Sequence, residues 1–435
     1  MEFDIIIVGG GAAGLMAACH APRGARVAVL ERLESPGRKI LATGGGRCNF
    51  TTALDALELP ALFGRQGRFI ANAVRAFPPE RIREWFAREG VDSVVEEGRF
   101  VFPASHRAAD ILEALRRAAQ KRGATIMTDT PAESLAIAAC GGADAPSRAV
   151  EGVRVVGRGA RPGGAADAGC LIRARKVILA AGGHSMPSLG SNGSGFALAR
   201  QAGHAVVDPV PALVPLVAAD EWAKSIPGVS LDDALVRFDP RKSGANKRMA
   251  AREERGAVMF THHGVSGPAV LDISGAVSEA LANGAPATLA LRPVADMDSE
   301  AWRATFAEWR AKNGGKALRN LLPAKLPRAF AQALCTLAGV PDAPLAQTGG
   351  DALRRLAEPC GWLPLAIAGT EGWDRSMATR GGVSLSEVHP ATLGSRLVRG
   401  LHFAGEILDL DAPCGGFNLT WAFASGALAM SSALG

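Results

Sequence analysis

Three glycines near the start of the chain have the spacing of a loop that binds a diphosphate. Gly9, Gly11 and Gly14 follow the apolar segment 3–8 in a G-x-G-x-x-G pattern. The first glycine of this pattern permits a tight turn, the second lets the backbone approach a pyrophosphate, and the third lets the following helix pack closely on the strand. Unpaired N–H groups at the start of that helix would face the anion. The spacing therefore predicts a site for a nucleotide diphosphate.

An acidic residue follows at the position that a dinucleotide site requires. A second apolar segment, 26–30, ends on Glu31. A carboxylate at the end of this strand is placed to accept hydrogen bonds from the ribose of an adenosine. The order strand, glycine turn, helix, strand and acid predicts a dinucleotide-binding domain, whereas the glycine motif alone would also be typical of an ordinary turn.

Three other glycine-rich segments decide between FAD and NAD. Segment 37–49 follows the acid, segment 176–183 is an apolar strand that stops on paired glycines, and segment 400–422 lies near the C-terminus. A helix that begins near Asn418 would direct its positive end at the pyrimidine end of a flavin, where negative charge gathers on reduction. These segments favour FAD.

Residues from all of these segments are expected to bind the cofactor. The set comprises Gly9, Gly11, Ala12, Ala13, Gly14, Glu31, Arg32, Arg38, Lys39, Thr43, Gly44, Gly45, Gly46, Asn49, Ala132, Ala181, Gly182, Gly183, Gly405, Glu406, Gly415, Gly416, Phe417 and Asn418. Arg38 and Lys39, together with Arg47, are candidates for neutralising the diphosphate, and solvated surface cations are the alternative.

Together these segments resemble the YhiN/BaiN-type flavoproteins, a family within the glutathione-reductase-like FAD-binding folds. The resemblance spans nearly the whole chain. Its most specific parts are GGGRCN at 44–49, HGVSGPAVL at 263–271, and Gly405-Glu406 followed by GGFNL at 415–419.

This resemblance implies an α/β fold in which a Rossmann-like FAD-binding domain is interrupted by a β-barrel domain that carries a helical insert. It also implies non-covalent FAD. Activities linked to family members include reduction of steroid-type double bonds, amine oxidation and reduction of uracil in ribosomal RNA. We expect an FAD-dependent oxidoreductase that transfers a hydride to an activated double bond. An RNA-modifying flavoenzyme, a flavin-dependent amine oxidase and a sensor that binds NAD are the alternatives.

Composition changes along the chain indicate domain boundaries. Three prolines within 208–216 break any helix and suit the extended segments of a barrel. Trp302, Phe306 and Trp309 have helical spacing within 298–338, which predicts a helical core. The glycine- and alanine-rich stretch 140–169 predicts a hairpin excursion of the first domain. The expected organisation is an FAD-binding domain at 1–195 and 376–435, a barrel at 196–275 and 347–375, and a helical insert at 276–346.

Few side chains need to react if a flavin carries the hydride, because the protein then supplies binding, orientation and a proton. His263 is a candidate proton donor near pH 7, and a structural role is the alternative. Cys48 and Cys414 lie in segments expected near the flavin, but no neighbouring cysteine completes a dithiol, so packing is the alternative to a catalytic thiol. The chain contains no tyrosine to act as the acid.

The balance of basic and acidic residues limits the kinds of binding partner that the sequence predicts. The 435 residues are 48% hydrophobic and include 48 basic and 42 acidic side chains, for a net charge of +6. This balance permits nucleic-acid binding without requiring it. Basic residues gather at 241–255 and 312–328, which are either solvated faces or surfaces for RNA. A small-molecule substrate or ribosomal RNA is therefore the expected partner.

The sequence favours a cytoplasmic protein. No run reaches the 18 apolar residues that a membrane span requires, and the chain opens on a strand of the fold rather than on a basic leader. Seven cysteines without a C-x-x-C pair argue against a disulfide framework or a metal site. No second G-x-G-x-x-G follows a strand, so NAD(P)H, as a possible electron donor, would have no domain of its own.

Overall fold

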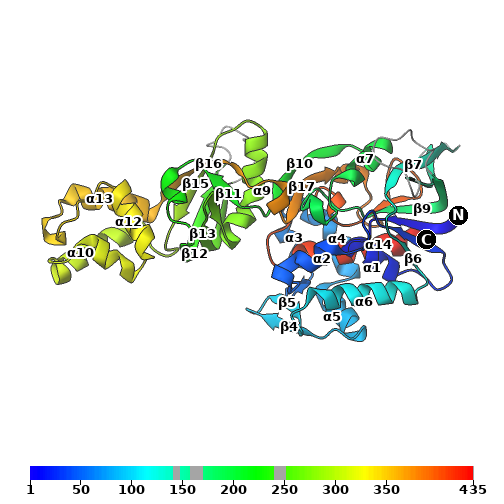
Figure 1. Ribbon diagram of the computed structural model, residues 1–435, viewed down its shortest axis with the longest axis horizontal. Coiled ribbons are helices and arrows are strands. Elements are labelled where there is room, and N and C mark those ends of the chain that lie inside the picture. The colour runs from blue at the N-terminus through cyan, green and yellow to red at the C-terminus, as the bar shows by residue number, and fades with distance from the viewer. Residues whose placement is uncertain (141–146, 157–169, 240–250, 435) are drawn as a thin grey trace. The chain divides into compact units, whose positions relative to one another are not determined.

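The chain forms two compact units in the computed structural model, which describes residues 1–140, 147–156, 170–239 and 251–434. Unit 1 contains Met1–Pro209 and the chain from Ala378 onward, and unit 2 contains Val210–Met377 (Figure 1). The first unit is therefore interrupted by the second, as the sequence predicts.

Unit 1 is built on a seven-stranded sheet. Its strands are β1 (Glu2–Val8), β2 (Val27–Leu30), β6 (Thr125–Met127), β7 (Ala132–Ala139), β8 (Arg148–Val155), β9 (Cys170–Leu179) and β18 (Leu401–Phe403). The order is β6-β2-β1-β9-β8-β7, and β18 also pairs with β9. β6, β2, β1, β9 and β18 run parallel. β7 and β8 form an antiparallel hairpin, which confirms the predicted excursion; 141–146 and 157–169 lie outside the described residues.

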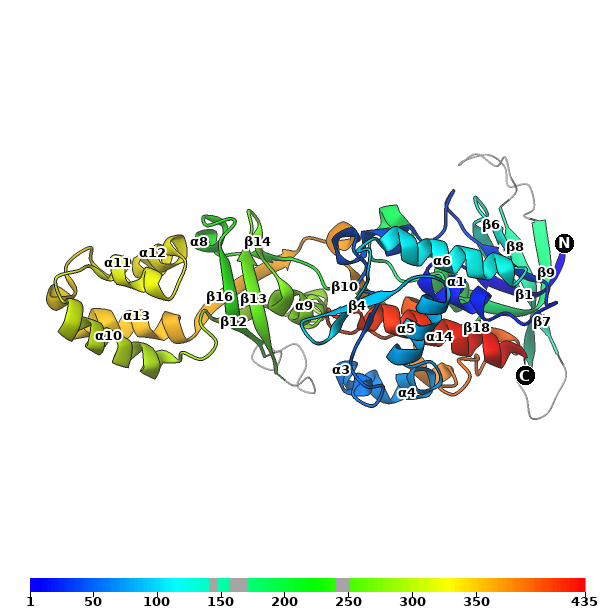
Figure 2. The same ribbon diagram turned by 90° about the horizontal axis from the view of Figure 1, so that it is seen from below.

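Helices of unit 1 pack against this sheet and against one another. They are α1 (Ala12–Cys19), α2 (Arg38–Ala42), α3 (Leu59–Leu62), α4 (Gly67–Ala76), α5 (Pro79–Arg88), α6 (Ala108–Lys121), α7 (Ser194–Gln201) and α14 (Phe417–Leu434). Helices α1, α7 and α14 contact strands of the sheet, whereas α4 packs on α14 and α6 packs on α1. Helix α1 lies between α6 and α14 (Figure 2). Among the described residues of the whole chain, no helix combines the length and apolar character needed to cross a bilayer.

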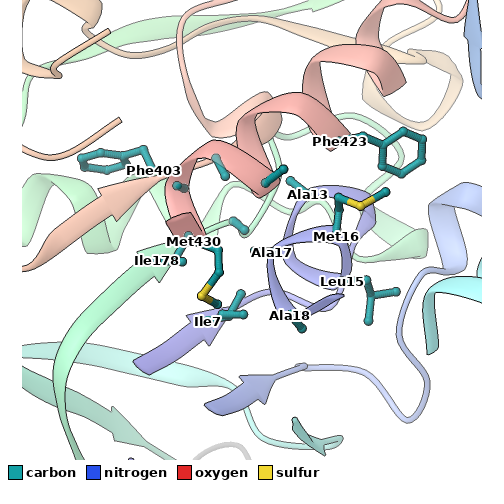
Figure 3. Packing of buried hydrophobic residues seen from close by; sticks show 14 of the residues in the cluster. Ile7, Ala13, Leu15, Met16, Ala17, Ala18, Ile178, Phe403, Phe423 and Met430 are labelled. Carbon is teal, nitrogen blue, oxygen red and sulfur yellow. The ribbon is translucent and has the colours of Figure 1, made fainter. Parts of the chain in front are cut away.

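Small side chains let α1 and α14 approach each other closely. A Cβ added at Gly426 of α14 would lie 2.3 Å from the carbonyl oxygen of Ala13. Around this contact, Met16, Phe423 and Met430 belong to the same buried cluster (Figure 3). Such close packing fixes the start of α1 relative to α14.

Two smaller sheets complete unit 1. β3 (Thr51–Thr52), β4 (Ser93–Glu96) and β5 (Phe100–Pro103) form an antiparallel sheet with β5 in the centre. β10 (Val206–Ala212) pairs with β17 (Ala378–Val383). In β10 the chain leaves unit 1, and in β17 it returns.

Unit 2 contains the expected barrel, which is closed and antiparallel. Its strands are β11 (Leu216–Ala218), β12 (Ser230–Phe238), β13 (Arg252–Phe260), β14 (Gly264–Ser266), β15 (Ala287–Arg292) and β16 (Leu363–Thr370), in the order β11-β14-β13-β12-β15-β16. Alternate residues of β15 are buried, as expected where one face of a strand lines a core. Helix α9 (Pro268–Ala282) packs against β12 and β13.

A helical region lies between β15 and β16. It consists of α10 (Ser299–Asn313), α11 (Leu318–Leu321), α12 (Arg328–Leu337) and α13 (Gly350–Gly361), and the remaining helix of unit 2 in the described residues is α8 (Glu221–Lys224). Asp298 caps α10 by accepting hydrogen bonds from the N–H groups of Glu300 and Ala301, at 3.0 and 2.9 Å. Trp302 and Phe306 are buried, which confirms that the aromatic stripe belongs to a core.

The observed boundaries differ from the expected ones. Helix α7 buries Phe196 and Leu198 in the core of unit 1, so this unit continues past residue 195 to Pro209. β15 falls within the expected insert 276–346 but is a barrel strand, and α13 falls within the expected barrel segment 347–375 but is a helix. β15 has only six residues, and its pairing with β12 and β16 rather than its composition places it in the barrel.

Candidate functional site

The carboxyl ends of five parallel strands of unit 1 lie in one row. Val8 pairs with Leu30 and Leu179, Leu30 pairs with Met127, and Leu179 pairs with Phe403. The chain continues from these ends into the loops that start at residues 9, 31, 128, 180 and 404. Ligands of open parallel sheets bind outside the carboxyl ends of the strands. The strand register therefore gathers the predicted cofactor segments at the edge where a ligand is expected.

The three glycines of the first loop have the steric roles that their spacing predicts. Gly9 has a φ of 105°, and an added Cβ would lie 2.5 Å from the carbonyl oxygen of Ala180. A Cβ added at Gly14 would lie 1.9 Å from the carbonyl oxygen of Gly9. At Gly11, nothing lies within 4 Å of an added Cβ. The backbone at the start of α1 therefore faces open space, as a diphosphate bound to a helix N-terminus requires.

Glu31 is held at this edge by two backbone hydrogen bonds. Its Oε2 accepts from the N–H of Gly10 at 2.9 Å, and its Oε1 accepts from the N–H of Leu33 at 2.8 Å. Each carboxylate oxygen has further acceptor capacity, so Glu31 can still accept a hydroxyl of a ribose. The segment leading to β7 lies beside it, because the N–H of Thr130 donates to the carbonyl oxygen of Glu31 at 2.9 Å and Ala132 follows two residues later.

The loop after β9 folds back over its paired glycines. The predicted residues 181–183 follow β9 directly, and the N–H of Gly193 donates to the carbonyl oxygen of Gly183 at 3.0 Å. The side chain of Arg32 donates to the carbonyl oxygen of Gly190 at 3.4 Å. This loop is thereby joined to the residue that follows Glu31.

An exposed glycine turn, Thr43–Gly46, precedes β3. Gly44, Gly45 and Gly46 have φ values of 56°, 64° and 88°, in the left-handed region that favours glycine. Nothing lies within 4 Å of a Cβ added at Gly45. The Oδ1 of Asn49 accepts from the N–H of Val101 at 3.1 Å, which fixes the end of the turn against β5. The turn thus presents backbone groups to open space from a fixed base.

Gly416 of the C-terminal glycine pair lies beside Asn49, which follows this turn. A Cβ added at Gly416 would lie 2.9 Å from the Oδ1 of Asn49, and one at Gly415 would lie 2.4 Å from the ring of Phe417. Helix α14 begins at Phe417, close to the predicted start near Asn418. Phe417 itself is buried, so its ring packs in the core.

Asn418 fixes the loop that leads into α14. Its side-chain N–H donates to the carbonyl oxygen of Ala412 at 2.8 Å, and its Oδ1 accepts from the N–H of the same residue at 3.1 Å. These hydrogen bonds give Asn418 a positioning role that the sequence does not reveal.

The cations expected to neutralise the diphosphate all have carboxylate partners. The ion pairs are Arg38–Glu34 at 3.9 Å, Arg47–Glu96, and Lys39–Glu406 at 2.7 Å. Arg47 also lies over the ring of Phe102, at 4.2 Å from its centroid. These side chains are paired with acids, and their contact with the diphosphate stays a prediction. The N–H groups at the start of α1 are a second source of positive potential at Gly11.

Cys48 does not have the properties of a reactive thiol. It is fully buried, and burial raises the pKa of its thiol to about 12. The nucleophilic thiolate is then absent at neutral pH. Burial and the raised pKa favour the packing alternative for Cys48, and its catalytic role stays a prediction; Cys414 is half-buried.

Cys48→Ser and Cys414→Ser are each expected to retain FAD and to be reduced at the parent rate, because neither cysteine belongs to a C-x-x-C dithiol in the sequence. Cys48→Ser is expected to lose about 1 kcal/mol of stability from the buried hydroxyl. Flavin content, anaerobic reduction and urea unfolding measure these effects, with Cys335→Ser in unit 2 as the matched burial control. Lost turnover with the flavin retained would instead make that cysteine catalytic.

His263 lies in unit 2, in the exposed turn between β13 and β14. Its N–H donates to the Oγ1 of Thr261 at 3.2 Å, and its carbonyl oxygen accepts from the N–H of Ala218 at 3.0 Å. The next helix, α9, begins at Pro268, as the Ser-Gly-Pro segment predicts. The role of His263 as a proton donor stays a prediction.

Four residues of this edge were missed by the sequence interpretation. The N–H of Gly10 donates to the carboxylate of Glu31, and the N–H of Gly193 donates to the carbonyl oxygen of Gly183. The hydroxyl of Ser185 and the N–H of Thr379 both donate to the carboxylate of Glu406. The glycine- and serine-rich run 190–195 was a signal for Gly193, because it follows the paired glycines closely. Thr379 gave no signal, because it lies 194 residues from Ser185 along the chain.

Comparisons with known proteins agree with this geometry. The model of the HI0933-like protein Rossmann domain matches residues 3–432. The 3-dehydro-bile acid delta(4,6)-reductase of Clostridium scindens is 33% identical over 97% of each chain. The ribosomal RNA dihydrouridine synthase of Escherichia coli is 29% identical over 98% of this chain and 96% of its own.

A solved structure shares the fold at lower identity. The 3-ketosteroid delta1-dehydrogenase from Sterolibacterium denitrificans, in complex with 1,4-androstadiene-3,17-dione, matches with a TM-score of 0.53 and 14% identity. The match covers 100% of this chain and 99% of that chain. At this identity the similarity shows a shared architecture.

Proposed function

The chain belongs to the HI0933-like family of FAD-dependent oxidoreductases, and on this premise we propose that it transfers a hydride through non-covalent FAD to a carbon–carbon double bond conjugated with a carbonyl group. The observation that carries the proposal is the row of five strand ends, with open space at Gly11 and an acid at Glu31. The names of the two relatives support the reaction class, because both describe saturation of a carbon–carbon double bond.

The residues at the strand edge fit the parts of FAD. The N–H groups at Gly11 and the first turn of α1, Ala12 and Ala13, would hold the diphosphate, and Glu31 would hold the adenosine ribose. Gly44 of the glycine turn and Gly416 of the C-terminal pair both lie beside Asn49, and both segments would face the flavin. FAD supplies the hydride-carrying ring when bound.

The protein itself must supply orientation and a proton. Hydride and proton together saturate the double bond, and the electrons are replaced by an external donor, for which we propose NADH or NADPH. With no tyrosine in the chain, His263 is our candidate for the proton.

An anaerobic half-reaction experiment tests this function. The holoprotein is reduced with NADH or NADPH and then mixed with a steroid that carries a conjugated 4-en-3-one. We expect re-oxidation of the flavin and an equal amount of the saturated ketone. A steroid with an isolated double bond is the matched control and should leave the flavin reduced. Re-oxidation only by oxygen, with consumption of small amines by the oxidised protein, would instead establish an amine oxidase.

Ribosomal RNA is the second candidate substrate, since the E. coli relative is a ribosomal RNA dihydrouridine synthase. Two cations of the basic segment 241–255 lie in the described residues, and one of them is neutralised. Arg255 donates to Asp233 at 2.6 Å and to Asp296 at 2.8 Å. Residues 241–250 lie outside the described residues. The RNA proposal therefore depends on Arg252 and on the cations that precede it.

Reversing the charges of Lys247, Arg248 and Arg252 tests the RNA proposal. Each phosphate contact contributes about −0.7 to −0.9 to the slope of log affinity against log salt. If RNA is the substrate, loss of three contacts should therefore reduce the slope by about 2–3 without changing the FAD content. The same reversal at Arg116, Arg117 and Lys121 in unit 1 is the matched control. Equal RNA binding by the variant and the parent between 50 and 200 mM salt would contradict the proposal.

A further inference from the structure

Lys39 and Glu406 form an ion pair at the strand edge. The Nζ of Lys39 lies 2.7 Å from the Oε2 of Glu406, and it also donates to the Oγ of Ser185. Lys39 comes from α2 and Glu406 from the turn after β18, so the pair joins segments 367 residues apart. The side chains are 25% and 23% exposed, so each is partly withdrawn from solvent yet still accessible to a ligand.

Two buried hydroxyl residues complete the surroundings of Glu406. Its Oε1 accepts from the Oγ of Ser185 and from the N–H of Thr379, both at 2.8 Å. The Oγ1 of Thr379 accepts from the N–H groups of His184 and Ser185, at 2.8 and 3.2 Å. Ser185 and Thr379 have no exposed surface. Three other segments of the chain therefore hold the carboxylate of Glu406 in a fixed orientation.

This carboxylate lies next to the start of α1. A Cβ added at Gly405, the residue before Glu406, would lie 2.8 Å from the Cβ of Ala13. Glu406 therefore comes directly after Gly405, which lies against the first turn of α1. The charged group that faces Glu406 is Lys39, while Ser185 and Thr379 are neutral.

We propose that Lys39, Ser185 and Thr379 are positioning residues that hold Glu406 as an oriented anion toward the bound cofactor, so that Lys39 acts through Glu406 rather than on the diphosphate. This inference rests on the proposed binding of FAD at the same edge. Lys39 and the two neutral donors hold the pKa of Glu406 below its usual value, although burial alone would raise it. Without Lys39, burial would dominate and the carboxylate would take up a proton at higher pH.

Lys39→Met tests the proposal through the pH dependence of FAD affinity. In the parent, affinity should be nearly constant between pH 5.5 and 8. In the variant, affinity should fall as the pH falls, by roughly tenfold for each unit below the raised pKa of Glu406. Lys39→Arg should restore the flat profile, and Lys39→Met/Glu406→Gln should also be flat because no carboxyl remains to titrate. Lys121→Met, which breaks the exposed ion pair with Glu89 at 3.1 Å, is the matched control.

Unfolding of the apoprotein gives an independent measurement. In Lys39→Met the folded pKa of Glu406 lies above its unfolded value, so the stability deficit relative to the parent should be larger at pH 8 than at pH 5. A deficit that is equal at all pH values, together with an FAD affinity lowered equally at all pH values, would overturn the positioning role. If the parent binds no FAD, the proposed function fails, while the unfolding measurement still decides whether Lys39 controls Glu406.

Discussion

Replacing Gly11 with valine is expected to abolish FAD binding while the apoprotein stays folded. Nothing lies within 4 Å of a Cβ added at Gly11, so the larger side chain displaces no protein atom. It fills the space that the diphosphate needs against the start of α1. Overpacking costs about 1–3 kcal/mol or more, which corresponds to a loss of about 10–100-fold in affinity, and exclusion of an anion from a helix N-terminus adds to this. We therefore expect the affinity for FAD to fall by roughly a hundredfold or more.

Flavin content and calorimetric titration of the apoprotein measure this effect, and thermal unfolding of the apoprotein checks the fold. Gly369→Val is the matched control, because nothing lies within 4 Å of a Cβ added at this glycine of β16 in unit 2. Full FAD occupancy in Gly11→Val would show that the diphosphate does not bind at this loop.

Gly14→Ala is expected to destabilise unit 1 and to lose FAD as a consequence. An added Cβ would lie 1.9 Å from the carbonyl oxygen of Gly9, and a backbone atom cannot move aside without shifting α1 away from β1. We expect a loss of about 3 kcal/mol in the free energy of unfolding. The two glycine variants therefore differ in kind: Gly11→Val affects the ligand, and Gly14→Ala affects the packing.

Urea unfolding of the apoprotein, followed by a probe in unit 1, measures this loss. Gly350→Ala in α13 is the matched control for the same substitution in a helix, since nothing lies within 4 Å of its added Cβ. It should be neutral or slightly stabilising. A Gly14→Ala protein as stable as the parent would contradict the close approach of α1 to its own strand.

The roles of Gly9 and Gly14 could be predicted because they are local. The strand, the turn and the helix that leave no room for a Cβ at Gly14 lie within residues 2–19. The spacing of the glycines in the sequence is therefore enough to predict where a side chain cannot fit. The family, the interrupted α/β fold and the barrel were also predicted correctly, because their motifs extend along most of the chain.

The partner of Lys39 could not be predicted in the same way. Its position beside a glycine-rich segment indicated a contact with the diphosphate, but its carboxylate partner Glu406 lies 367 residues away. The pairing of β18 with β9 brings the turn that carries Glu406 to the edge of the sheet where Lys39 lies, and this register is a property of the folded sheet. Thr379 was missed for the same reason, since its partners Ser185 and Glu406 come from two other loops.

The identity of the nucleotide released on denaturation tests most directly the claim that FAD binds at the carboxyl ends of the five parallel strands. The purified protein should be yellow, and heat denaturation should release FAD in an amount close to one molecule per chain. The five strand ends, the open glycine loop and the acid Glu31 predict a dinucleotide, and the glycine turn 44–46 with the pair Gly415–Gly416 predicts its flavin end. Release of FMN or of NAD alone would contradict this account.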